Sequence, residues 1–117
     1  MTQNKKLIQQ MPEMLHQFEL LLRSGYNIKQ SLDILVNDLS EPMSSEMGQI
    51  GQDIDNGQTV IQAFDAFLSR VPHADIDLFV ATIRVQFDSR GNLADKFSFL
   101  NQVMAKRRLV PTGLDAS

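Results

Sequence analysis

The sequence contains no cysteine, and this absence excludes disulfides, thiol nucleophiles and thiolate metal sites together. Only two histidines occur, His16 and His73, which is too few for most zinc sites unless carboxylates complete the ligand shell. The glycine pair in residues 48–51 lacks the lysine and the strand-to-helix context of a phosphate-binding loop. No apolar run reaches the roughly 18 residues that would span a bilayer. We therefore expect no catalytic residue, no metal site and no cofactor, and we expect that the chain is not an enzyme.

Basic residues are scarce in the body of the chain. Residues 7–105 hold 6 Lys and Arg against 13 Asp and Glu, a net charge of −7. The other five basic residues stand at the two ends, as Lys5, Lys6, Lys106, Arg107 and Arg108. An acidic body disfavours the phosphate backbone of a nucleic acid as a partner. The basic ends have two interpretations: helix ends exposed to water, or segments beside a membrane whose cytoplasmic flank favours Lys and Arg.

Apolar residues recur at helical spacing along almost the whole chain, and no convincing strand pattern occurs. The predicted class is all-α. Six helices are expected, over residues 7–22, 28–39, 42–54, 60–68, 74–89 and 93–104. Pro12 lies near the start of the first helix, where it is tolerated only if the helix proper begins there or residues 5–11 form a preceding turn. The third helix has a weak apolar stripe interrupted by Gly48 and Gly51, so we expect it to be the most exposed.

The turns between helices repeat one device, a glycine that ends one helix followed by a side chain that caps the next. The three pairs are Gly25 with Asn27, Gly57 with Thr59, and Gly91 with Asn92. Residues 25–33 align with residues 57–65, and residues 91–93 are a shortened third copy. The predicted architecture is a six-helix antiparallel bundle built from three helix–turn–helix hairpins. Residues 1–110 are assigned to one domain and residues 111–117 to a tail or linker.

Helix 74–89 is apolar on two sides, which is typical of a helix that is central in its bundle or partly in an interface. Central burial is the favoured interpretation. A structural salt bridge is the favoured role of Arg84, which lies in a polar strip between the two sides. Leu20 and Ile34 lie off the main apolar stripes of their helices, and Leu78 and Val85 lie on the second apolar side of helix 74–89. With Arg84, these are the candidate interaction residues.

Three stretches of the sequence resemble a known family. They are residues 70–75 (RVPHAD), 81–86 (ATIRVQ) and 91–95 (GNLAD), together with the glycine turns. The turns resemble those of the type II secretion system F domain. The three stretches are similar to its Tad/Flp pilus branch, the TadB/TadC-like inner-membrane platform proteins. Arg90 stands where that branch has a glycine.

The resemblance implies a function that the residue pattern alone does not give. Members of this family are inner-membrane proteins whose six-helix domain lies on the cytoplasmic side. They form the platform on which a hexameric secretion ATPase drives pilin assembly, and they have no known enzymatic activity. The implied partners are that ATPase, a second platform protein or another copy in a homodimer, pilins, and the membrane through segments absent from this chain. The alternative is a soluble helical adaptor that binds a partner peptide or helix.

Overall fold

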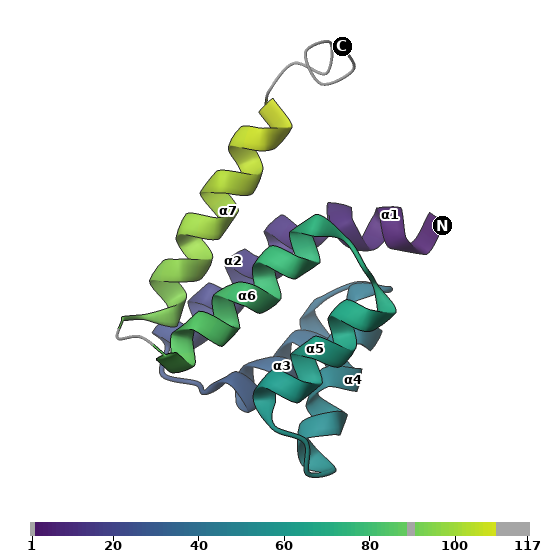
Figure 1. Cartoon of the computed structure of the whole chain (residues 1–117), viewed down its shortest axis with the longest axis vertical. Helices are drawn as coiled ribbons and strands as arrows, with labels where there is room; N and C mark the ends of the chain where they lie inside the picture. The colour runs from purple at the N-terminus through teal and green to yellow at the C-terminus, as the bar shows by residue number, and fades with distance from the viewer. Residues whose placement is uncertain (1, 89–90, 110–117) are drawn as a thin grey trace.

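The computed structural model describes residues 2–88 and 91–109, which form seven α-helices and no β-strand (Figure 1). The all-α class and the assembly of helical hairpins are therefore confirmed. The tail assigned to residues 111–117 lies outside the described residues. The helices are α1 (Thr2–Gln9), α2 (Met11–Arg23), α3 (Ile28–Asp38), α4 (Met43–Asp55), α5 (Val60–Arg70), α6 (Ala74–Asp88) and α7 (Leu93–Leu109).

The first predicted helix is two helices, because α1 ends at Gln9 and α2 begins at Met11. Pro12 occupies the first turn of α2, where its missing N–H has no helical partner to lose. The side chain of Gln10 holds this junction against the α3–α4 connection. Its Nε2 donates to the Ser40 carbonyl at 2.9 Å, and its Oε1 accepts from the Met43 N–H at 3.1 Å. The two hydrogen bonds of Gln10 thus attach the α1–α2 junction to the α3–α4 connection.

Two of the turns end with a capping box. Asn27 accepts from the Gln30 backbone N–H while the Gln30 side chain accepts from the Asn27 N–H, and Thr59 and Gln62 do the same. Gly57 has φ 105°, in a region that costs residues with a Cβ conformational energy. The turns before α3 and α5 are therefore specified locally.

Phe79 of α6 lies at the centre of the core. Its ring contacts Phe18 of α2 and Phe97 of α7 at centroid distances of 6.4 and 5.5 Å. It also contacts Phe64 and Phe67 of α5 at 5.5 and 6.4 Å. All five rings are fully buried. The predicted central burial of α6 is therefore confirmed for the face that carries Phe79.

The expectation that the third predicted helix is the most exposed is wrong. Helix α4 packs against both α3 and α5. Its fully buried apolar side chains are Met43, Met47 and Ile50. Its two glycines face α3: a Cβ on Gly48 would lie 3.4 Å from Val36 Cγ2, and one on Gly51 would lie 3.5 Å from Asp33 Oδ1. The glycines that weaken the helix in isolation therefore let two helices approach closely.

An ion pair joins the first turn of α6 to the last turns of α7. The Asp75 residue is only 6% exposed, and its Oδ1 lies 2.7 Å from Nη2 of Arg107. The Asp75 backbone N–H donates to His73 Nδ1 at 3.0 Å. A buried carboxylate without a partner is costly, and the Arg107 guanidinium supplies that partner. This contact fixes where α7 lies relative to α6.

The positive φ of Gly57 gives a first prediction. Nothing lies within 4 Å of a Cβ added there, so a substitution costs backbone strain and no steric clash. Gly57→Val should destabilise the fold by about 1 kcal/mol or more and lower the melting temperature by about 4–8 °C. Far-UV circular dichroism at low temperature should be unchanged. Gly57→Asn is the matched control and should lose less, because Asn tolerates positive φ better. Equal melting temperatures for Gly57→Val and the unsubstituted chain would contradict this account.

The Asp75–Arg107 pair gives a second prediction. Arg107→Met keeps the apolar stem but deprives a buried carboxylate of its cation, so it should cost about 1–2 kcal/mol after allowance for the half-exposed guanidinium. Lys106→Met, one residue earlier and exposed, is the control and should cost less than about 0.5 kcal/mol. Asp75→Asn should make Arg107→Met less costly in a double-mutant cycle. Denaturant unfolding measures the free energy of unfolding of the four chains in the cycle: unsubstituted, Arg107→Met, Asp75→Asn and the double variant. If the costs of the two single substitutions simply add in the double variant, the pair is not coupled.

Candidate interaction surface

The segment that leads into α6 makes structural contacts with the rest of the bundle. Nε of Arg70 donates to Glu46 Oε1 at 2.9 Å, and its guanidinium lies 6.0 Å from the centre of the Phe67 ring. Val71 is buried and ends α5, and Asp75 is held as described above. Most of the stretch 70–75 therefore serves to turn the chain from α5 into α6.

Arg84 pairs with Asp65, which ties α6 to α5. Both side chains are close to half exposed, so solvent screens the pair and its contribution is about 0–1 kcal/mol. At the end of the same helix, Nε2 of Gln86 donates to the Gly91 carbonyl at 3.0 Å. These contacts orient α6 between its two neighbours in sequence, α5 and α7.

The candidate apolar residues are not gathered in one place. Leu78 and Val85 of α6 are 39% and 50% exposed and line the same groove. Leu20 of α2 is 49% exposed, and Ile34 of α3 is half-buried; neither lines that groove. The structure therefore separates one surface on α6 from isolated apolar positions on α2 and α3.

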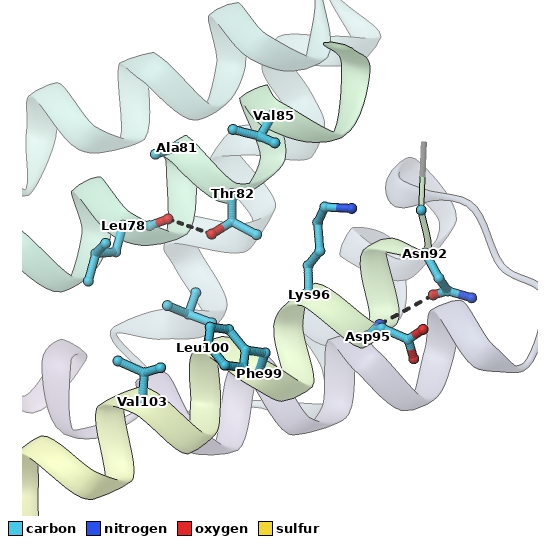
Figure 2. A pocket seen from close by; sticks show the side chains of 11 residues that line it. Leu78, Ala81, Thr82, Val85, Asn92, Asp95, Lys96, Phe99, Leu100 and Val103 are labelled. Carbon is cyan, nitrogen blue, oxygen red and sulfur yellow. Dashed lines mark hydrogen bonds between the residues drawn. The ribbon is translucent and has the colours of Figure 1, made fainter. Parts of the chain in front are cut away.

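The groove lies between α6 and α7 and has a volume of about 610 Å³ (Figure 2). Its walls are mainly apolar: the side chains that matter here are Leu78, Ala81, Val85, Phe99, Leu100 and Val103. Thr82 also lines it, but its hydroxyl donates to the Leu78 carbonyl of its own helix at 2.8 Å. The groove therefore offers apolar contact and little hydrogen bonding.

Phe99 was not among the predicted interaction residues, although it is 67% exposed. A signal for it was present in the sequence. The buried stripe of α7 contains Leu93, Phe97 and Leu100, and position 99 falls well to one side of that stripe on a helical projection. An aromatic residue off the core stripe indicates a second apolar side, as Leu78 and Val85 do for α6.

Charged groups near the helix junctions have shifted pKa values. The pKa of Arg23 is raised by its hydrogen bond to Glu19 and then by that to Asp95 of α7, which lies 2.9 Å from Nη2. The pKa of Lys29 is raised chiefly by its hydrogen bond to Asp33. The same cations join neighbouring helices: Arg23 joins α2 to α7 through Asp95, and Lys29 joins α3 to α4 through Asp55 at 3.1 Å.

Within residues 2–88 and 91–109, no group of three or more Asp, Glu or His side chains is placed to hold a metal ion. The helices in the same ranges include none that is long and apolar enough to cross a membrane. What the described surface offers is an apolar groove and scattered ion pairs.

Comparison with known proteins identifies the family. No curated protein matches the chain, and no solved structure matches it. The family model described as type II secretion system (T2SS), protein F, matches residues 14–110, which include α2 from Met14 onward and all of α3 to α7. This match covers most of the chain, so the chain belongs to the T2SS protein F family.

Proposed function

We propose that this chain is the cytoplasmic domain of an inner-membrane platform protein in a Tad/Flp pilus or type II secretion apparatus. In this role it scaffolds assembly and couples a hexameric secretion ATPase to pilin polymerisation through protein contacts, without catalysis. The observation that carries the proposal is the family match across residues 14–110. The other partners proposed are pilins and a second platform protein or another copy of the chain.

The Tad/Flp assignment is supported by where the three resembling stretches lie. Residues 70–75 lead into α6, residues 81–86 lie within it, and residues 91–95 begin α7. The stretches that suggest this branch are therefore consecutive around the central helix. Sequence differences between the branches of the family at these positions would change the surface of α6 and leave the core unchanged.

The membrane-side orientation is supported by the positions of the basic ends. Along the longest axis of the molecule, the C-terminal part of α7 lies at one end and the α4–α5 turn at the other, and α1 lies to one side in the half that holds the end of α7 (Figure 1). Lys5 and Lys6 belong to α1, and Lys106 and Arg107 belong to α7. A cytoplasmic domain joined to membrane segments at both ends would place its basic residues on one side, facing anionic lipid.

A third prediction concerns topology. The chain has no cysteine, so Gln58→Cys in the exposed α4–α5 turn introduces a single thiol in this domain. In intact cells that express the protein from its own open reading frame, a membrane-impermeant maleimide should not label this thiol. Labelling should appear after the inner membrane is permeabilised. The unsubstituted protein controls for cysteines outside this domain, and labelling in cells whose inner membrane is intact would overturn the cytoplasmic assignment.

A fourth prediction concerns self-association, which the homodimer proposal requires. The isolated chain should associate weakly, with Leu20 in the contact because it is apolar and exposed. Leu20→Ser should abolish association in sedimentation velocity while leaving the melting temperature nearly unchanged. Ile34 is half-buried, so Ile34→Ser should also lower the melting temperature. A chain that remains monomeric at every concentration would remove the homodimer from the proposal.

A further inference from the structure

One side of α7 combines basic and apolar side chains beside the groove. Lys96, Phe99, Val103 and Lys106 follow one another at spacings of three, four and three residues, which places them along one side of the helix. The Lys96 side chain extends from α7 toward α6 at one end of the groove (Figure 2). Lys106 stands one turn beyond Val103, toward the other end. Among the described residues, neither lysine makes an ion pair.

The dimensions of the groove fit one helix. Leu78 and Val85 are two turns apart on α6, a rise of about 10 Å, and Lys96 and Lys106 are about 15 Å apart along α7. Two helices that form apolar walls are the usual receptor for an amphipathic helix, which inserts residues at positions i, i+3 or i+4, and i+7. A helix of three to four turns would fill the groove and reach both lysines.

The charges select the kind of helix. The body of the chain carries a net charge of −7, yet Lys96 lines one end of the groove. Lys106 lies outside the lining, on the same side of α7 and one turn beyond Val103. Asp95 also lines the groove, but its carboxylate is 2.9 Å from the Arg23 guanidinium. Among the described residues no carboxylate pairs with either lysine, so both are complementary to acidic residues at the two ends of an apolar stripe.

The same charges disfavour two other occupants. A second copy related by a two-fold axis across the groove would place the Lys96 end of one chain against the Lys106 end of the other, so that like charges meet. An anionic membrane surface would attract the two lysines, but the groove is concave and the acidic body of the chain would be repelled. A partner protein fits both the shape and the charge.

We infer that the α6–α7 groove binds an amphipathic helix of a partner protein, with acidic residues at both ends of its apolar stripe paired with Lys96 and Lys106. Phe99 and Val85, which are 67% and 50% exposed, supply the apolar contact. The inference goes beyond the proposed function and does not depend on which secretion machine the protein serves.

The probe is a pair of synthetic helical peptides of about 14 residues with the same leucine stripe. One carries Glu at both ends and the other carries Lys. Fluorescence anisotropy with the complete 117-residue chain at low salt should show that the acidic peptide binds at least about tenfold more tightly. Its affinity should fall as salt is raised, because screening weakens the contacts with the two lysines.

Variants locate the site. Phe99→Ser and Val85→Ser should each weaken binding of the acidic peptide about tenfold, as the loss of an interface anchor does. Leu20→Ser is the matched control, because Leu20 is exposed to nearly the same extent as Val85 but lies on α2. It should bind the peptide like the unsubstituted chain. The double variant Lys96→Glu, Lys106→Glu should reverse the preference and bind the basic peptide more tightly.

Each contrary result rejects the inference. Equal affinity for the two peptides, or no binding of the acidic peptide up to about 1 mM, would remove the helix partner. Dimerisation that Phe99→Ser abolishes would assign the groove to a second copy. Phe99-dependent sedimentation with phosphatidylglycerol vesicles would assign it to a membrane. None of these results alters the maleimide-labelling test of the proposed function, so the two can fail separately.

Discussion

The packing of Phe79 against four other aromatic rings is the contact on which the rest of the structure depends. Phe18, Phe64, Phe67 and Phe97 come from three other helices, so one ring holds α2, α5 and α7 around α6. The contacts with Phe18, Phe64 and Phe67 are edge-to-face, and aromatic pairs of this kind add about 0.5–1.5 kcal/mol each to the gain from burial. A helix that is committed to this core on one face leaves its opposite face uncovered. The exposed apolar residues of α6 are a consequence of its central position.

Contacts at both ends of α6 make the uncovered face a defined groove. At the C-terminal end, Gln86 donates to the carbonyl of Gly91, which lies two residues before α7. At the N-terminal end, Asp75 binds Arg107 near the end of α7. Since α6 and α7 are held together at both ends, the space between them is formed before any partner binds. Preformed sites lose less conformational entropy on binding.

The sequence predicted which segments are helical, because apolar spacing and the Gly-plus-cap turns are local signals, but it did not show that the first segment is two helices, α1 and α2. It did not reveal how the helices pack. The burial of α4 depends on Gly48 and Gly51 facing α3, and one helix's pattern does not show which neighbour its glycines will meet. The sequence predicted a salt bridge for Arg84 but not its partner, because Asp65 lies on another helix. The groove itself needs α6 beside α7, a juxtaposition that Phe79 determines.

The central claim is that α6 is the rigid element that presents the groove. Native-state hydrogen exchange of α6 tests this claim most directly. Amides near Phe79 should exchange only through global unfolding, with an opening free energy equal to that from denaturant unfolding. Helix α1 packs mainly against α2, so its amides should exchange through an opening of lower free energy. Exchange of the α6 amides through local opening, at a lower free energy than those of α2, would contradict the account.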